Sequence, residues 1–258
     1  MLTQYDCWES PTAAEVASAL AANPSLFAWQ GYVPGWGRPY GGGWSAQAAQ
    51  AVMDAGLGYL PLLVPNSGDA AQTPQAPQGW DEAVIFARHH VASGGELTVL
   101  GLNVEAPWSA ADPAGWRAAA LAFAAACRRA GVDSFPYGSP SFLASLAVGL
   151  AAPSGIYGGV WPNGTNSPYP LPSSPAFIPG IPDSDWAGPG QRIWQYQGGH
   201  SVPGLSMQVD SSVTTAEVAY CRKISTPAPA PQPDPKPQIT VLGPGTYTLP
   251  QGATISVN

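Results

Sequence analysis

Charged residues are scarce in this sequence. They make up 10% of the 258 residues, whereas about 25% is typical of a soluble domain. The net charge of −7 includes only nine Lys and Arg residues. Because these nine do not cluster into a basic stripe that could follow a phosphate backbone, we expect no nucleic-acid partner.

Long apolar runs are also missing. No run reaches the roughly 18 apolar residues that a membrane-spanning helix requires. Residues 1–10 lack the basic start and apolar core that are typical of a secretory signal peptide. We therefore expect no membrane partner and no conventional secretion.

The sequence contains few residues that could hold a metal or a cofactor. Its three cysteines are far apart and form no Cys-x-x-Cys pair, which favours buried free thiols over a disulfide framework or a zinc site. His89 and His90 are adjacent on a predicted helix and face different directions, and His200 stands alone. Phosphate-loop, dinucleotide-binding and serine-hydrolase motifs are absent. We expect no metal and no cofactor.

Short β-like runs alternate with alanine-rich amphipathic stretches from residue 1 to about 160, a pattern typical of βα units around a parallel sheet. The eight strand candidates are 2–6, 26–32, 57–64, 97–104, 134–137, 155–160, 192–197 and 206–211. The helix candidates are 12–22, 45–55, 80–92, 113–130, 140–147 and 215–221. Residues 161–190 have the composition of a long loop. The predicted fold class is α/β, a (β/α)8 TIM-type barrel whose later units are irregular.

The C-terminal part has a different composition. The segment PAPAPQPDPKP at 227–237 favours an extended spacer, because proline removes hydrogen-bond donors and fixes the backbone. We predict a barrel over 1–225, a proline-rich linker over 226–238 and a small β segment over 239–258. A hairpin of that size is too short to be stable alone, so we expect it to dock on another protein.

Four polar residues stand where strand patterns stop. These residues are Asp6, Asn103, Glu105 and Asp210. Functional side chains of parallel barrels lie at the carboxyl ends of the strands, and the spacing of Asn103 and Glu105 points both side chains to the same face. Glycoside hydrolysis needs a carboxylic acid beside the leaving oxygen, a role that suits Glu105. The alternative is that each residue only caps a loop or holds a backbone amide.

Aromatic and amide residues accompany these strand ends. Flat rings could stack on sugar faces, although the same rings could simply fill the mouth of the barrel. The candidate substrate-binding residues are Trp29, Tyr32, Tyr137, Trp161, Trp194, Gln195 and Tyr196.

Five segments of the chain are informative together: YDCWESPTAAEV, GLNVEAP, PYG at 136–138, RIWQYQGG and SMQVDSSV. In this order they resemble family 25 lysozymes and the neighbouring glycoside-hydrolase-like family of actinobacteria and their phages. The resemblance covers most of residues 1–222. It implies that Asp6 lies on the cavity floor, that Glu105 is the general acid, and that Asp210 is a carboxylate near the sugar. It also implies cleavage of N-acetylmuramoyl bonds in peptidoglycan.

The chain departs from the lysozyme pattern at one position. The family carries Asp-x-Glu on the fourth strand, and this sequence has Asn103 in place of the aspartate. An amide cannot offset positive charge on the sugar ring, and loss of such a stabiliser costs about a hundredfold in rate, on the order of 3 kcal/mol. Asp6 or Asp210 could compensate for it.

Three functions therefore remain open. The first is a peptidoglycan-directed glycosidase used in phage lysis or carried on the virion, which would place the protein in the particle or in the infected host cytoplasm, acting at the cell wall. The second, which Asn103 favours, is a non-catalytic glycan-binding or structural tail or capsid component. The third, a barrel enzyme acting on a small metabolite, is disfavoured by the aromatic rim and the missing phosphate loop.

Overall fold

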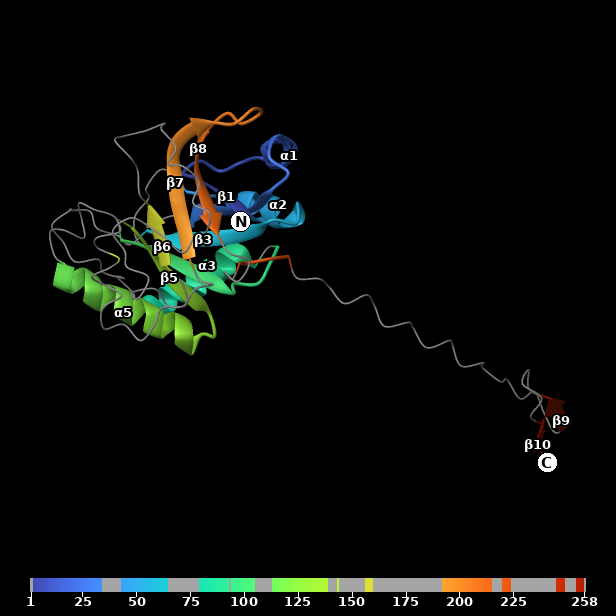
Figure 1. Cartoon of the computed structure of the whole chain (residues 1–258). Helices are drawn as coiled ribbons and strands as arrows, with labels where there is room; N and C mark the ends of the chain where they lie inside the picture. The colour runs from blue at the N-terminus through green and yellow to red at the C-terminus, as the bar shows by residue number, and fades with distance from the viewer. Residues whose placement is uncertain are drawn as a thin grey trace. The chain divides into compact units, whose positions relative to one another are not determined.

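The computed structural model describes residues 2–33, 43–64, 79–92, 94–104, 113–138, 143, 156–159, 192–214, 220–223, 245–248 and 254–257. Two compact units, Met1–Ile224 and Ser225–Asn258, divide the chain. Figure 1 shows the elements of the first unit around a strongly curled sheet.

Eight strands and four helices make up the described part of the first unit. The strands are β1 (Leu2–Cys7), β2 (Leu26–Val33), β3 (Gly58–Leu63), β4 (Val99–Asn103), β5 (Asp133–Gly138), β6 (Ile156–Gly159), β7 (Arg192–Ser201) and β8 (Gln208–Thr214). The helices are α1 (Ala13–Ala22), α2 (Ala46–Asp54), α3 (Trp80–Val91) and α5 (Pro113–Arg129). Each strand pairs with the next in the chain, and β8 pairs again with β1.

The prediction of a mixed α/β fold is confirmed, but that of a regular (β/α)8 barrel is not. Strands β1 to β7 are parallel to their neighbours, whereas β8 is antiparallel to both β7 and β1. The short turn 202–207 connects β7 to β8, and such a short connection cannot join parallel strands. Pairing is also thin at β3–β4 and β5–β6, where two residue pairs each are joined.

Three predicted elements need separate comment. The predicted helix 215–221 is wrong at its end, since Cys221 forms an antiparallel bridge with Tyr59. Residues 215–219 lie outside the described part of the chain. The predicted helix 140–147 lies outside it except for residue 143, and the loop 161–190 lies wholly outside it.

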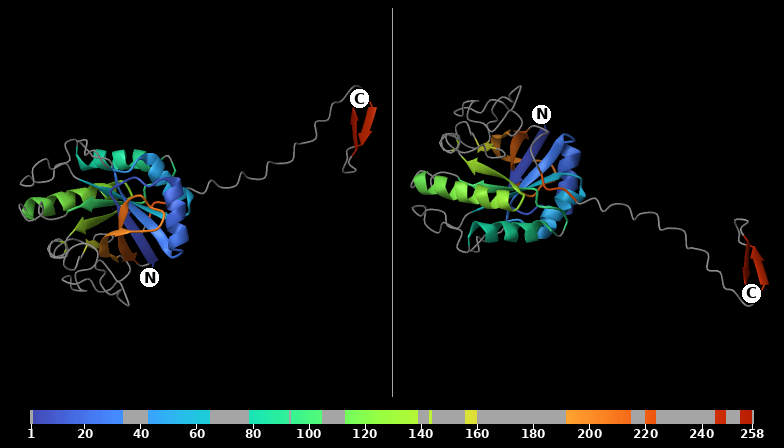
Figure 2. Two further views of the ribbon diagram at one scale, coloured as in Figure 1. Left: turned by 90° about the horizontal axis from the view of Figure 1, so that it is seen from above. Right: turned by 90° about the horizontal axis from the view of Figure 1, so that it is seen from below.

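Local sequence explains where the helices begin. In α1, Thr12 is the N-cap and forms a capping box with Glu15; the two groups satisfy amides that the helix itself leaves unpaired. The Ser45 side chain caps α2 in the same way by accepting from the Ala48 amide. Figure 2 shows the four helices on the outside of the curled sheet.

The faces of the strands that meet the helices form an apolar core. Trp44, fully buried, stacks on Tyr59 with ring centroids 5.5 Å apart, and its indole nitrogen donates to the Cys7 carbonyl at 3.0 Å. The ring lies so close to Gly31 that a Cβ there would be 2.1 Å from Trp44 Cδ2. Trp44 and Tyr59 are therefore held in the apolar core by close packing.

The second unit contains one hairpin. Strand β9 (Gly245–Thr248) pairs antiparallel with β10 (Thr254–Val257), and both strands lie within residues 239–258. Among the helices that the structure describes, none combines the length and apolar character needed to cross a membrane.

Candidate functional site

Polar side chains gather at one end of the curled sheet. Asp6 lies at the end of β1, Asn103 ends β4, and both are buried. Asp210 is paired with Asp6 across β1 and β8. The sequence predicts Asp210 at the end of its strand, but it lies near the beginning of β8. Because β8 is antiparallel, its beginning meets the carboxyl ends of the parallel strands.

Gln195 joins the two carboxylates. Its Nε2 donates to Asp6 Oδ2 at 3.2 Å and to Asp210 Oδ2 at 2.9 Å. Its Oε1 accepts a hydrogen bond from the Tyr137 hydroxyl at 3.1 Å. Asp6 Oδ2 also accepts from Gln30 Nε2 at 2.9 Å. These donors are neutral, so they fix the orientation of both carboxylates without adding a positive charge.

Asp210 is held by the backbone as well. Its Oδ1 accepts from the Gly199 amide at 2.5 Å. The pairing of β7 with β8 shifts register between Gln197 and His200, and such a bulge releases backbone groups from the ladder. Gly199 has a φ of 53°, a left-handed conformation that glycine adopts at little cost. The irregular end of β7 thus supplies the amide that binds Asp210.

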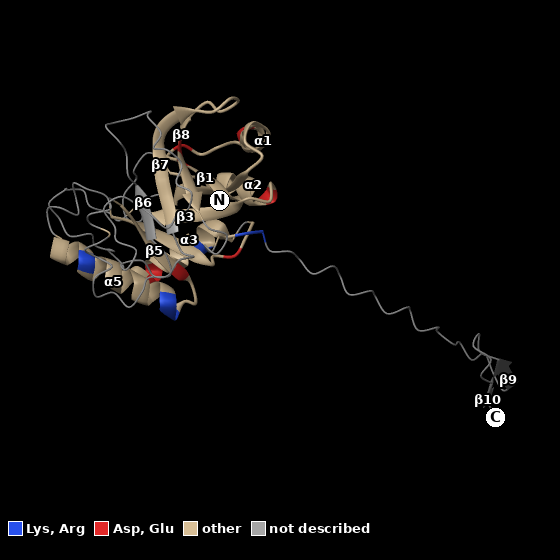
Figure 3. Ribbon diagram, in the orientation of Figure 1, with Lys and Arg blue, Asp and Glu red and all other residues tan. Residues whose placement is uncertain are grey.

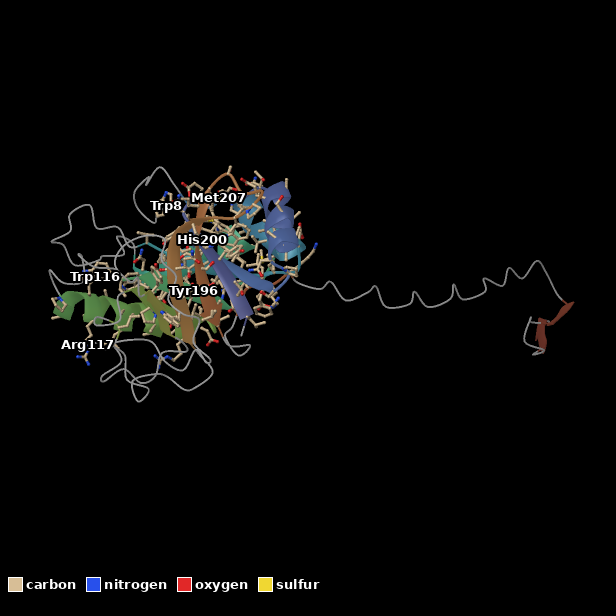
Figure 4. The ribbon with its side chains drawn as sticks, turned by 45° about the horizontal axis from the view of Figure 1, so that its top comes forward. Trp8, Trp116, Arg117, Tyr196, His200 and Met207 are labelled. Atoms are coloured by element: carbon tan, nitrogen blue, oxygen red, sulfur yellow. The ribbon has the colours of Figure 1, made fainter. Side chains whose placement is uncertain are left out.

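A pocket of about 430 Å³ opens onto these carboxylates. It lies between the end of β1, the end of β2 and the β7–β8 turn, and its lining residues are Asp6, Cys7, Trp8, Glu9, Tyr32, Gly199, Ser206, Met207, Gln208 and Asp210. Trp8 is 38% exposed, and its ring centroid lies 4.8 Å from that of Tyr32. Figure 4 shows Trp8 and Met207 at the same end of the molecule. The pocket therefore combines an exposed aromatic ring with carboxylates.

The pocket is acidic. Three of its lining residues, Asp6, Glu9 and Asp210, carry carboxylates, and none of the described lining residues is Lys or Arg. Basic residues of the described chain lie instead on α3, on α5 and at 222–223 (Figure 3). Within the part of the chain that the structure describes, no cluster of three or more His, Cys, Asp or Glu residues could hold a metal ion. Such a pocket suits a neutral ligand rich in hydroxyl groups better than an anionic one.

Cys7 lines this pocket without being a nucleophile. Burial and the neighbouring Asp6 carboxylate raise the pKa of the Cys7 thiol, so the reactive thiolate is suppressed. Its Sγ accepts a hydrogen bond from Trp29 Nε1 at 3.3 Å.

The structure brings several predicted site residues together. Asp6, Asp210, Tyr137 and Gln195 share one hydrogen-bond network, and Tyr32 lines the pocket. Asn103 is paired with Tyr137 in the β4–β5 register and is 3% exposed. Glu105 and Trp161 lie outside the described residues.

The other predicted aromatic residues lie elsewhere. Trp29 is fully buried and Trp194 is 2% exposed, so neither can stack on a sugar in this structure. Tyr196 is half-buried and packs edge-on against Trp194. Because successive side chains of a strand alternate between its two faces, the neighbours of Gln30 and Gln195 point away from the carboxylates.

Sequence reasoning missed several contributors to the site, including Gly199 and the lining residues of the β7–β8 turn. Trp8 and Glu9 follow directly after β1, at the edge where the pocket opens. Gln30 is a fully buried amide within the otherwise mostly apolar strand β2. A buried polar residue on an apolar strand requires a partner, and this signal could have pointed to Gln30.

No protein-family model matches the chain, and no curated protein matches it either. Solved structures share its fold. An uncharacterized protein of B. stearothermophilus has 16% identity and a TM-score of 0.56, covering 84% of this chain and 98% of its own. GHIP, a glycosyl hydrolase 25 of Streptococcus pneumoniae, has 12% identity and a TM-score of 0.55, covering 83% and 87%.

The Tat-secreted protein Rv2525c of Mycobacterium tuberculosis, in complex with L-tartrate, has a similar fold. Its identity is 12% and its TM-score 0.50, with 84% of this chain and 98% of its own covered. At such identities the similarity shows the fold: this chain has the fold of glycoside-hydrolase-like proteins.

Proposed function

We propose that this protein is a glycan-directed, glycoside-hydrolase-like protein that binds cell-wall polysaccharide in the pocket beside Asp6 and Asp210. The observation that carries the proposal is the pair of carboxylates held by Gln195 in a pocket that the exposed Trp8 also lines. Carboxylates accept hydrogen bonds from sugar hydroxyls, and an exposed indole provides a flat apolar face for a pyranose ring. The glycosyl hydrolase with a similar fold supports the same class of ligand.

Hydrolysis is the first form of this function. Glu105, which follows Val104 directly in the chain, would act as the general acid and protonate the leaving oxygen of the glycosidic bond. Asp6 and Asp210 would then stabilise the positive charge that develops on the ring, in place of the aspartate that Asn103 replaces. In this form the protein cleaves peptidoglycan as an N-acetylmuramidase.

Binding without turnover is the second form, and Asn103 favours it. Its neutral amide is buried on β4 beside Tyr137, where the lysozyme pattern has a carboxylate. A site with this change keeps the shape and the hydrogen bonds that hold a sugar, but it loses electrostatic stabilisation of the transition state. Both forms use the same pocket.

The test measures binding and release together on purified actinobacterial peptidoglycan. If the wild-type protein releases soluble muropeptides and Glu105→Gln does not, the protein is a glycosidase with Glu105 as its acid. If the wild type is retained on the walls without release, it is a binding protein, and release by Asn103→Asp would identify the silencing residue. Failure of the wild-type protein to bind the walls would reject the proposed function.

We also propose that the hairpin of β9 and β10 docks on another protein. Two strands alone bury too little surface to be stable in water, and the proline-rich residues 226–238 would let the hairpin reach a partner. Deletion of 227–258 should leave retention on peptidoglycan unchanged. If deletion abolishes retention, the hairpin belongs to the glycan-binding surface instead. A location in a phage particle stays a prediction.

A further inference from the structure

The turn between β7 and β8 forms one wall of the pocket. The pairing of the two strands ends at Ser201 and Gln208, so residues 202–207 extend beyond the ladder. Ser206, Met207 and Gln208 nevertheless line the pocket. The position of this wall therefore depends on contacts made outside the hairpin.

Glu15 of α1 supplies the main contact to this turn. Its Oε1 accepts hydrogen bonds from the Ser206 amide at 3.1 Å and from the Ser206 hydroxyl at 2.5 Å. Its Oε2 accepts from the amide and the hydroxyl of Thr12, both at 2.8 Å. From the Glu15 side chain, a capping box needs only the bond to the Thr12 amide. One carboxylate oxygen of Glu15 thus caps the helix, and the other accepts hydrogen bonds from the turn.

The charge on Glu15 strengthens this contact. Hydrogen bonds, that from the Ser206 side chain first, lower the pKa of Glu15 to about 2. The carboxylate is therefore ionised at every pH at which the protein would meet a cell wall. Hydrogen bonds to an ionised acceptor are about twice as strong as those between neutral groups.

The turn also packs directly on α1 at a second place. Gly204 has a φ of 84°, and a Cβ at this position would lie 2.6 Å from the Cβ of Ser18. A glycine is required here both for the backbone conformation and for the close approach. Val202 at the start of the turn is buried, and its carbonyl accepts a hydrogen bond from the Leu205 amide at 3.1 Å. The turn is a compact unit seated on the helix.

We propose that Glu15 is a positioning residue that sets the shape and affinity of the glycan pocket by fixing Ser206 and with it the β7–β8 wall. Glu15 does not line the pocket itself, so it acts on the ligand only through the turn. This inference rests on the proposed function. It predicts that a side chain outside the pocket controls binding of the sugar.

The experiment compares Glu15→Ala with Thr12→Ala in the full-length protein. Both substitutions weaken the start of α1, but only Glu15→Ala releases Ser206. We expect Glu15→Ala to reduce affinity for purified actinobacterial peptidoglycan about tenfold, because the ligand must then order the turn. Thr12→Ala should reduce it less than about twofold. Hydrogen exchange of the Ser206 amide should accelerate in Glu15→Ala and stay slow in Thr12→Ala.

A further variant keeps the test valid if Glu15→Ala folds poorly. Gly204→Ala displaces the turn from Ser18 without changing either residue of the capping box, and it should lower affinity to a similar degree. Two results would overturn the inference while leaving the proposed function intact. The first is an equal loss of affinity in Thr12→Ala and Glu15→Ala. The second is an affinity that stays unchanged in both Glu15→Ala and Gly204→Ala. If the wild type does not bind, both fall.

Discussion

Replacing Gln195 with methionine removes the centre of the carboxylate network while keeping nearly the same side-chain volume. Gln195 is fully buried and makes three hydrogen bonds, two of them to carboxylates. A hydrogen bond to a charged group contributes about 1.5–3 kcal/mol, and a neutral hydrogen bond contributes about 1 kcal/mol. Loss of all three bonds could therefore lower the free energy of unfolding by at most about 7 kcal/mol. Asp6 keeps its bond from Gln30, and Asp210 keeps that from Gly199.

We therefore expect Gln195→Met to lower the free energy of unfolding by about 3–4 kcal/mol, a large part of the about 5–15 kcal/mol that stabilises a typical protein. Urea unfolding followed by tryptophan fluorescence measures this change. The matched control is Gln197→Met on the same strand, where the residue is half-buried and the change should stay within about 0.5 kcal/mol. A loss below about 1 kcal/mol in Gln195→Met would refute the view that this amide holds both carboxylates.

Three further outcomes follow from the packing. Gly31→Ala should destabilise the protein by about 3 kcal/mol or more, because the added Cβ would lie 2.1 Å from a buried Trp44 atom; a thermal midpoint equal to that of the wild type would contradict this. Burial lowers the pKa of His90 to about 4 from 6.5, so the unfolded state binds more protons between these values and stability should fall as pH decreases from 6.5 to 4. His90→Gln should remove that part of the pH dependence, and urea unfolding at several pH values measures it. If the free energy of unfolding of His90→Gln varies with pH as steeply as that of the wild type, the result would count against the burial of His90. A thiol reagent should label no cysteine in the native protein and three after unfolding, since all three are buried and free: Cys7, Cys127 and Cys221.

The repeating elements were predictable because their signals are local. The predicted helices 12–22 and 113–130 match α1 and α5 closely. The almost wholly apolar run 57–64 predicts a strand covered on both faces, and every residue of β3 is buried. The antiparallel direction of β8 could also have been predicted, because the eight residues 198–205 between the predicted strands 192–197 and 206–211 are too few for a parallel crossover. The prediction of a regular barrel did not use this signal.

The site was predictable only in part. Asp6 and Asp210 stand out in the sequence because they are carboxylates at positions where strand patterns stop. The partners of these carboxylates come from strands far apart in the chain, since Gln195 lies 189 residues from Asp6. Trp29 and Trp194 look equally suitable as sugar platforms until the strand faces are assigned, and both then fall on the face away from the carboxylates.

The sequence by itself determined the βα alternation, the approximate helix positions, the low charge and the strand-end carboxylates, because each depends on residues close together in the chain. Only the tertiary structure decided that β8 pairs with β1, that Gln195 joins Asp6 to Asp210, and that Glu15 holds the wall of the pocket. These features depend on how closure of the curled sheet brings its first and last strands together. That closure is a property of packing across the whole unit and leaves no local pattern in the sequence.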